Sequence, residues 1–328
     1  MNWEMLGHEW AVDLLKEHIG RGEVRHAYLF TGPQGVGRRT LALRLAQALN
    51  CLQPPGLGEP CLKCRACKHI ERMQHPDLLV VQAEQVGGTL KVDQVRELQY
   101  SLALHPYEAR YRLALLLRFE EANPSAMNAL LKTLEEPAPQ VVLVLTAESA
   151  ESLLPTIVSR CEVLRMRPVP LELVSQGLQE RWGMPSAQAQ LLAHISAGRP
   201  GYALRLGREP KRLEQRRLWL DDHARLLLAT RVERFAYAEA LSKDKDVVQE
   251  LLSTWLSYWR DVLLKACGAA TPLANQDRQE EIEALAEQVG FQVAHRTVSA
   301  LQRTLDLLEQ YVNLRLALEV LMLDLPRS

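Results

Sequence analysis

The sequence lacks a charge excess of either sign and any long hydrophobic segment. Its 328 residues carry 39 Lys and Arg against 40 Asp and Glu, a formal net charge of −1. Such a chain has no long-range field that draws it to nucleic acid or anionic lipid, so any DNA contact must be local or shared with partners. Because no run of roughly eighteen apolar residues occurs, we expect no signal peptide, no membrane-spanning helix and a cytoplasmic location.

Cysteine is also scarce, at six residues. Six thiols in a chain of this length argue against a disulfide framework, and no internal repeat or low-complexity tract is present. The length suggests roughly two or three domains, enough for a sizeable hydrophobic core. The distribution of the cysteines is unusual, because four of the six lie close together.

The clustered cysteines follow the spacing C-x9-C-x2-C-x2-C and are Cys51, Cys61, Cys64 and Cys67. The two short intervals let neighbouring thiolates converge on one tetrahedral ion. We therefore predict a structural Zn²⁺ site in a knuckle over residues 51–67. Two alternatives stay open: His69 or His75 replaces one thiolate, or the four thiols are unrelated. The other two cysteines, Cys161 and Cys267, are expected to be packing residues.

Short apolar runs bounded by turn residues predict strands that are buried on both faces. They occupy residues 27–31, 78–82, 113–117 and 141–146, with a further strand signal at 163–166. Between them, apolar residues recur at helical spacing over 41–49, 92–104 and 125–134, and Pro137 ends the last of these helices. Strands that alternate with helices imply a parallel sheet covered on both sides. The predicted fold class is therefore α/β, of the nucleotide-binding type.

After residue 166 the strand signals stop, and Pro168 and Pro170 mark a boundary. From there we predict only helices, over 171–182, 187–197, 201–206, 214–229, 247–266 and 296–323, with a loop at 268–277. The predicted domains are a core over 1–167 that contains the knuckle, a helical lid over 168–209 and a larger helical domain over 210–328.

A glycine-rich segment, Gly32–Thr40, follows the first predicted strand and opens a helix, which is the context that a phosphate loop requires. Its glycines let successive backbone N–H groups turn toward an anion. Two side chains depart from the pattern, because Arg38 stands where a compact Lys is expected and Arg39 stands where Ser or Thr would bind Mg²⁺. Thr40 lies one residue late, about 100° around the helix. The candidate nucleotide-binding residues are therefore Gly32, Gly35, Gly37, Arg38, Arg39 and Thr40.

Three outcomes remain open for this loop: tight nucleotide binding without turnover, weak vestigial binding, or no binding. The second magnesium ligand of such a site is an acid directly after the strand at 113–117. Arg118 and Phe119 follow instead, and Glu120 and Glu121 come two places later. Because both expected ligands are lost together, we expect no ATPase activity of the chain's own. An ATPase motor that uses Glu120 and Glu121 stays as the alternative.

Five stretches together resemble the delta-prime family of subunits of the bacterial DNA polymerase III clamp loader, which belongs to the AAA+ proteins. They are His26–Pro33 with the glycines that follow, the cysteine knuckle, Asn128–Pro137, Leu154–Cys161 and Asn313–Glu319. The resemblance spans nearly the whole chain. It implies an AAA+ core of the phosphate-loop type with an inserted zinc knuckle, an all-α lid and an all-α collar that joins subunits into an oligomer.

The resemblance also implies a role for Arg160, the middle residue of a Ser-Arg-Cys element at 159–161. In that family the arginine of this element reaches the γ-phosphate of ATP held by a neighbouring motor subunit. Arg160 is therefore the candidate catalytic residue, acting in trans, and its planar guanidinium suits phosphate geometry. From the residues alone, without the resemblance, the favoured interpretation is that Arg160 caps a helix or pairs with an acid on its own surface.

Members of this family carry degraded ATP sites and act as a rigid stator, whereas the gamma and tau motor subunits keep the Lys, the Ser or Thr and the acidic strand end. The departures at Arg38, Arg39 and Arg118 fit the stator. The implied partners are gamma/tau and delta subunits in a hetero-pentamer, together with the sliding clamp and primer-template DNA in a DNA polymerase assembly. No membrane partner is expected.

Three further features carry alternatives of their own. The knuckle could read DNA, which predicts salt-sensitive binding by the isolated chain. A basic stretch is either a solvated helix face or a contact for a partner or DNA; it contains Arg199, Arg205, Arg208, Lys211, Arg212, Arg216 and Arg217. An apolar stripe is expected to be core, although the resemblance implies that some of its side chains lie at a subunit interface. The stripe contains Leu305, Leu308, Val312, Leu316 and Val320.

Overall fold

The computed structural model describes residues 3–85, 87–309 and 312–327 of the chain. The chain divides into two compact units, Met1–Gly177 with Gly198–Tyr202, and Leu178–Ala197 with Ala203–Ser328. Each unit has a hydrophobic core of its own. The domain boundaries at residues 168 and 210 stay predictions.

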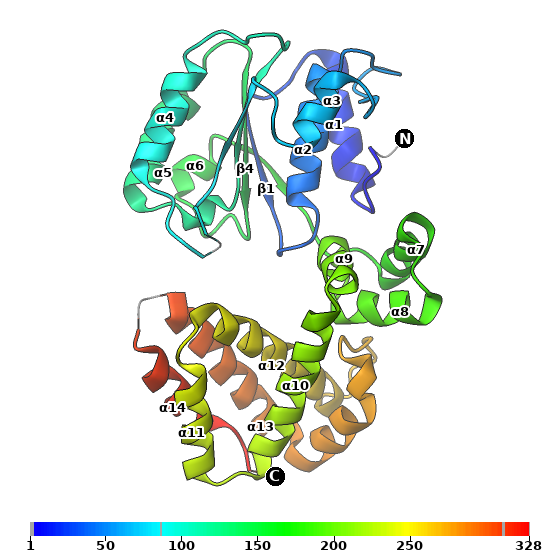
Figure 1. The fold of residues 1–328 in the computed structure, drawn as a ribbon, viewed down its shortest axis with the longest axis vertical. Helices are drawn as coiled ribbons and strands as arrows, with labels where there is room; N and C mark the ends of the chain where they lie inside the picture. Colours follow the sequence, from blue (N-terminus) through cyan, green and yellow to red (C-terminus); the bar gives the residue numbers. More distant parts are fainter. Residues whose placement is uncertain (1–2, 86, 310–311, 328) are drawn as a thin grey trace. The chain divides into compact units, whose positions relative to one another are not determined.

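The first unit contains a five-stranded parallel sheet with the order β2-β3-β4-β1-β5 (Figure 1). Its strands are β1 (Ala27–Thr31), β2 (Leu78–Val81), β3 (Arg112–Leu116), β4 (Val141–Ala147) and β5 (Glu162–Arg165). Every residue of the central strands β1, β3 and β4 is buried. The predicted α/β fold with a parallel sheet is therefore confirmed, because only a sheet covered on both faces buries whole strands.

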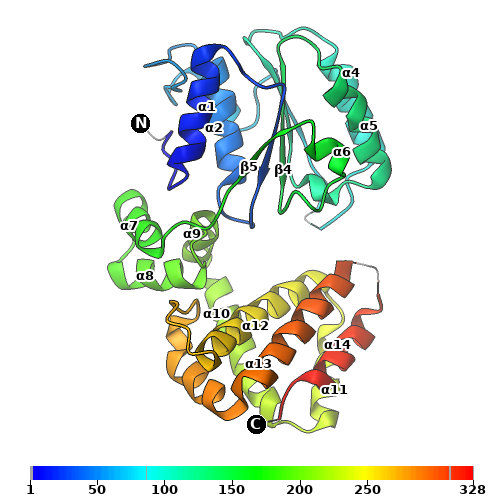
Figure 2. The ribbon, with the colours of Figure 1, turned by 180° about the vertical axis from the view of Figure 1, so that it is seen from behind.

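Helices cover both faces of this sheet (Figures 1 and 2). On one face lie α1 (Glu9–Arg21) and α2 (Arg38–Asn50), with the short α3 (Arg65–Glu71) beside α2. On the other face lie α4 (Val92–Leu102), α5 (Pro124–Glu135) and α6 (Pro155–Val158). Helix α5 begins as its sequence dictates, because Asn123 caps it through the Ala126 N–H and Pro124 takes the first helical position. A 3-10 turn, η1 (Phe119–Glu121), follows β3.

The rest of the described chain after β5 is helical. Its elements are α7 (Leu171–Trp182), α8 (Ser186–Ile195), α9 (Pro200–Arg208), α10 (Pro210–Leu228), α11 (Arg231–Leu241), α12 (Lys245–Ala266), the 3-10 turn η2 (Gln276–Arg278), α13 (Gln279–Glu309) and α14 (Leu314–Asp324). Helices α7 and α9 contain residues of both units. None of the helices in the described ranges is long and apolar enough to cross a membrane.

Two predictions for the helical region were wrong in detail. Helix α11 was not predicted, although Thr230 and Glu233 form a capping box at its start. The single helix predicted over 296–323 is two helices, since α13 begins earlier than predicted, at Gln279, and ends at Glu309, and α14 begins at Leu314. The Asn313 side chain accepts a hydrogen bond from the Leu316 N–H, and such a cap starts a new helix where apolar spacing alone suggests continuity. Residues 310 and 311 lie outside the described ranges.

Candidate functional site

The predicted phosphate loop joins β1 to α2. Gly32, Gly35 and Gly37 have φ values of 143°, 85° and 119°, which L side chains rarely adopt. At Gly32 a Cβ atom would lie 2.2 Å from the Met166 carbonyl oxygen, so no side chain fits there. The strand-loop-helix geometry of a phosphate loop is therefore present.

The start of α9 packs directly on this loop within the first unit. The Gly201 N–H donates to the Gly35 carbonyl at 2.8 Å. A Cβ atom at Gly35 would lie 2.8 Å from the Tyr202 backbone nitrogen. Gly35 is therefore required because any side chain here would collide with the backbone of the same chain.

Arg38 points away from solvent and toward an acid. Its side chain is 8% exposed, and its Nη1 lies 3.9 Å from Glu120 Oε1. Burial lowers the pKa of Arg38, while the charges of Glu120 and Glu148 raise it. Burial also raises the pKa of the Glu120 carboxyl, and the charge of Arg38 opposes that rise. The cation that a phosphate loop would offer to phosphate is thus paired with a carboxylate of the same chain.

The remaining magnesium positions are also changed. Arg39 and Thr40 are exposed on the first turn of α2. After β3, the Arg118 N–H donates to Thr146 Oγ1 at 2.9 Å, and Arg118 Nε donates to Glu121 Oε1 at 2.9 Å. Both Glu120 and Glu121 therefore face arginines, and residue 39 supplies no oxygen ligand. These residues do not fit a magnesium-bound nucleotide.

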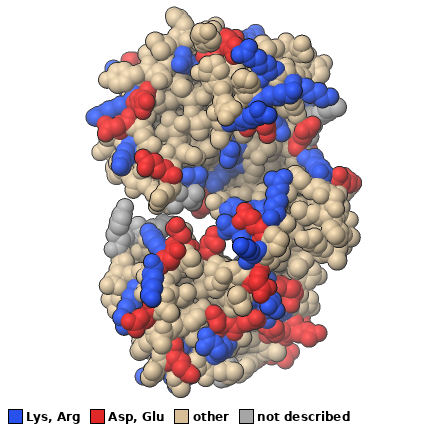
Figure 3. Space-filling view, in the orientation of Figure 1, with Lys and Arg blue, Asp and Glu red and all other residues tan. Residues whose placement is uncertain are grey.

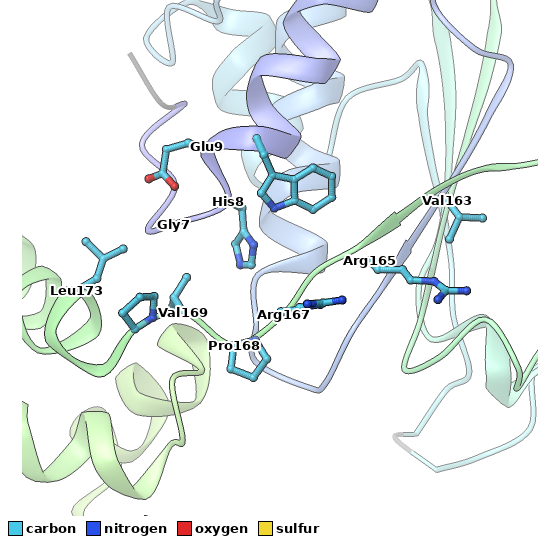
Figure 4. A pocket seen from close by; sticks show the side chains of 11 residues that line it. Gly7, His8, Glu9, Val163, Arg165, Arg167, Pro168, Val169 and Leu173 are labelled. Atoms are coloured by element: carbon cyan, nitrogen blue, oxygen red, sulfur yellow. The ribbon is translucent and has the colours of Figure 1, made fainter. Parts of the chain in front are cut away.

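A cleft of about 680 Å³ adjoins the loop. Its lining comes from the segment before α1 and the start of that helix, from β5, from the segment that follows β5 and from Leu173 of α7 (Figure 4). His8 lies in its wall, and the Val36 carbonyl of the phosphate loop accepts the His8 Nε2–H at 3.0 Å. Burial lowers the pKa of His8, although the bond to Val36 opposes this shift. His8 thus ties α1 to the loop as a neutral side chain.

The four clustered cysteines converge as predicted. The sulfur atoms of Cys51, Cys61, Cys64 and Cys67 all lie within 4.8 Å of one another. Cys61 Sγ and Cys67 Sγ are 4.0 Å apart, close to the roughly 3.8 Å edge of a tetrahedron with Zn–S bonds of about 2.3 Å. The donor set can therefore hold a metal ion.

Backbone N–H groups point at these sulfurs. Cys51 Sγ accepts from the Cys61 N–H at 3.3 Å, and Cys61 Sγ accepts from the Cys64 N–H at 3.2 Å. Burial alone would raise the pKa of Cys61, but the N–H groups of Lys63 and Cys64 and bonds with neighbouring thiols lower it to about 6. Burial raises the pKa of Cys51 and Cys67. A cation at the centre would be needed to ionise all four thiols together.

Among the described residues, neither His69 nor His75 belongs to the sulfur cluster. His75 is buried, and its Nδ1 accepts the Asp77 N–H at 3.1 Å. The knuckle is fixed to the rest of the unit, because Gln47 donates to the Cys67 carbonyl at 2.8 Å and Trp3 donates to the Gly58 carbonyl at 2.9 Å.

We expect the purified chain to carry about one zinc ion, and Cys64→Ser to carry little. The variant should unfold its knuckle locally, because four metal bonds supply order that the loop's few apolar side chains cannot. Metal analysis by mass spectrometry and amide hydrogen exchange over residues 51–72 measure both effects. Cys267→Ser is the matched control and should leave both unchanged. A chain that exchanges equally slowly with and without metal would contradict this prediction.

The two remaining cysteines differ from each other. Cys161 is half-buried against the core, and burial raises its pKa to about 12, so it is a neutral packing residue as predicted. Cys267 is exposed at the end of α12, and the prediction that it packs was wrong. It follows the last turn of the helix, beyond the apolar face that is buried.

Arg160 lies at the end of the turn that follows α6. Its Nη1 donates to the Thr156 carbonyl at 2.8 Å, and its Nη2 donates to Glu135 Oε1 at 2.6 Å. The side chains of Arg160 and Glu135 are 34% and 50% exposed. The pairing with an acid on its own surface is therefore present. It leaves three of the five guanidinium N–H groups without a partner among the described residues.

Three of the seven residues of the basic stretch are ion-paired within the helical unit. Arg212 contacts Glu209 and Glu250, and Arg217 contacts Glu214. Arg216 is buried, and its guanidinium donates to Asp277 and Asn275. Figure 3 shows acidic and basic side chains interspersed over the helical unit. These pairs favour the interpretation as a solvated, ion-paired surface.

The predicted apolar stripe is only partly core. Leu308 is buried, but Leu316 and Val320 on α14 are 56% and 51% exposed. With Leu323, which is 53% exposed, they form an exposed apolar face, called the α14 face below. The opposite side of the same helix is buried in the core through Leu318, Leu321 and Met322.

One structural residue had no counterpart in the sequence-based predictions. Arg234 on α11 is 2% exposed, and its five N–H groups meet five backbone carbonyls. The acceptors are the carbonyls of Leu226, Leu227, Met322, Leu325 and Pro326, at 2.8 to 3.2 Å. Arg234 therefore joins the end of α10 to the end of α14. Its place on one side of a short amphipathic helix gave no signal of this role.

Two family models match the chain. The one described as "DNA polymerase III, delta subunit" matches residues 7–170, and the one described as "DNA polymerase III, delta subunit, C terminal" matches residues 211–326. The chain is 31% identical over 316 residues to the DNA polymerase III subunit delta' of Bacillus subtilis, covering 95% of this chain and 94% of that one. It is 33% identical over 255 residues to the subunit delta' of Pseudomonas aeruginosa, covering 76% and 75%.

Other subunits of DNA polymerase III are also similar to this chain. The DNA polymerase III subunit tau of Escherichia coli is 31% identical over 200 residues, covering 60% of this chain and 30% of that one. Among solved structures, a DNA polymerase III gamma subunit-related protein from Thermotoga maritima has a TM-score of 0.51 and 19% identity, covering 95% of this chain and 97% of that one. This structural likeness supports the fold alone.

Proposed function

Because this chain belongs to the delta-prime family of DNA polymerase III clamp-loader subunits, we propose that it hydrolyses no ATP itself and gives Arg160 to a neighbouring ATPase subunit. The observation that supports this proposal is that the acids at the chain's own phosphate loop are paired with arginines. Arg38 Nη1 lies 3.9 Å from Glu120 Oε1 and Arg118 Nε donates to Glu121 Oε1 at 2.9 Å, so an arginine cation lies beside each acid and disfavours a magnesium ion there. We place the chain in a hetero-pentamer with gamma/tau and delta subunits that acts on the sliding clamp and primer-template DNA.

In this proposal Arg160 acts at the boundary between subunits. A guanidinium that reaches the γ-phosphoryl group stabilises the charge that spreads over its oxygens during transfer. The unpartnered N–H groups of Arg160 are the donors for this contact. The first unit of the chain serves as a rigid support, since its own phosphate loop is closed by backbone contacts.

We further propose that the thiolate cluster holds Zn²⁺ in a structural role. Four sulfur donors fill a tetrahedral shell and leave no open position for catalysis. Clustered cysteines that bind a metal and form no disulfide framework are typical of a reducing compartment, which supports a cytoplasmic location.

The purified chain is expected to show no steady-state ATP hydrolysis, whereas a self-sufficient motor would hydrolyse ATP through Glu120 or Glu121. The test measures phosphate release by the wild-type chain, by Arg38→Ala and by Glu120→Gln. Turnover by the wild-type chain that either substitution abolishes would refute the proposal and support the motor. Equal background rates in all three proteins would support the stator.

The α14 face is proposed to bind a neighbouring subunit in the collar. Replacing Leu316, Val320 and Leu323 with Ser is expected to weaken assembly by roughly 100-fold or more, because three large apolar side chains would lose their burial. The assay is light scattering of the reconstituted complex over a dilution series. Removal of residues 296–328 is a poorer test, since it also removes core residues such as Leu301 and Leu318.

The matched control for the α14 face replaces Leu228 and Val232 with Ser. These side chains are 76% and 77% exposed in the same unit but lie at the turn between α10 and α11. The control should assemble normally. A triple variant that assembles as tightly as the control would contradict the collar proposal.

A further inference from the structure

We propose that Glu135 is a positioning residue for Arg160, an inference that rests on the proposed function. The carboxylate of Glu135 accepts from Arg160 Nη2 at 2.6 Å, and the Thr156 carbonyl accepts from Nη1 at 2.8 Å. The two acceptors belong to different elements, α5 and α6. Together the two acceptors fix the plane of the guanidinium before it contacts the phosphate of ATP in the neighbouring subunit.

The backbone of Arg160 is already fixed without Glu135. Its N–H donates to the Ile157 carbonyl at 3.1 Å, and the next N–H, from Cys161, donates to the Val158 carbonyl at 3.2 Å. The Cys161 side chain packs against the core and remains a neutral thiol. The remaining freedom of Arg160 therefore lies in its long side chain, and this is the freedom that Glu135 restricts.

The position of Glu135 is unfavourable for its own helix. It is the last residue of α5, Glu136 follows, and Pro137 prevents continuation. The C-terminal end of a helix carries a partial negative charge, so a carboxylate there destabilises the helix. Local helix stability therefore does not account for an acid at residue 135, whereas the contact with Arg160 does.

Glu135 does not remove the charge of Arg160 from the boundary. The carboxylate is 50% exposed, so water screens it, and the ion pair is weak in energy. What it contributes is orientation, because a free arginine must lose much side-chain freedom when it binds phosphate. Three N–H groups stay available to phosphate while the fork is held. Glu135 therefore lowers the cost of ordering Arg160 in the transition state.

The experiment is a double-mutant cycle in the reconstituted loader, with clamp- and DNA-stimulated ATP turnover as the readout. Glu135→Ala is expected to lower kcat by about 5- to 30-fold with KM for ATP unchanged, because ATP is bound by the neighbouring subunit. Glu135→Gln should retain part of the rate, since an amide oxygen still accepts from Nη2. In the Arg160→Ala background, Glu135→Ala should have no further effect.

Glu136→Ala is the matched control, because it removes an adjacent exposed carboxylate for which the described chain shows no side-chain bond. It should leave kcat unchanged. A loader that depends on Arg160 but is indifferent to Glu135→Ala, is accelerated by it, or is slowed equally in the Arg160→Ala background would overturn this inference alone. A loader that turns over normally with Arg160→Ala would overturn the proposed function itself. Thermal unfolding of each free subunit checks that the variants remain folded.

Discussion

Arg160→Ala is expected to slow phosphoryl transfer at the neighbouring nucleotide by about 10³-fold or more. An arginine supplied in trans stabilises charge on the transferring phosphoryl oxygens and is worth roughly 10³–10⁵ in rate in the best-studied cases. The substitution removes the three N–H donors that have no partner in the described chain and leaves Glu135 on the surface, where water solvates it. The chain should remain folded, because Arg160 belongs to none of its hydrophobic core clusters, and assembly should persist, because the proposed collar contact is the α14 face.

Single-turnover hydrolysis by the reconstituted loader measures this effect. The amplitude of the fast phase should fall by the contribution of the ATP site in the subunit next to this chain. Arg160→Lys should recover only part of the rate, since an ammonium keeps the charge but not the planar fork. Arg165→Ala is the matched control, because Arg165 lies on β5 with a side chain that is 70% exposed, and its one ion pair within residues 3–85, 87–309 and 312–327 is a distant contact to Glu151 at 3.9 Å. A fast phase of full amplitude in the assembled Arg160→Ala loader would contradict the assignment.

Arg234→Met is expected to lower the free energy of unfolding of the helical unit by about 3–5 kcal/mol. The native side chain is 2% exposed and satisfies five carbonyls at the ends of α10 and α14. Hydrogen bonds to a charged donor are stronger than neutral ones, and buried carbonyls left without a donor carry a desolvation cost. The cation also lies at two helix ends that carry partial negative charge. Methionine fills the space but supplies no donor.

Urea unfolding followed by tryptophan fluorescence measures this loss, because Trp219, Trp255 and Trp259 are buried in the core of the helical unit. Arg231→Met is the matched control, since Arg231 lies on the same helix and is exposed. It should change stability little. A midpoint for Arg234→Met within the error of the control would show that the carbonyls find other partners. Since Arg234 holds the end of α14, the variant should also weaken assembly through the α14 face.

The cysteine spacing, the strand signals and the departures at Arg38 and Arg39 could all be found in the sequence. Each depends on short-range patterns, because ligand spacing, burial of a strand on two faces and the order of residues in a loop are encoded within a few residues. Features that depend on more distant or competing contacts were harder to predict. The split between α13 and α14 was missed because the capping of Asn313 competes with an apolar spacing that continues through it.

The sequence by itself determined that this chain has an α/β core with a four-cysteine knuckle and that its phosphate loop lacks the usual magnesium ligand. Only the tertiary structure decided where the arginines go: Arg38 to Glu120, Arg160 to Glu135, and Arg234 to carbonyls near residue 226 and near the end of α14. The physical reason is that a charged side chain takes its partner from whatever the fold brings within about 4 Å. These partners lie 7 to 92 residues away in the sequence, where no local pattern specifies them.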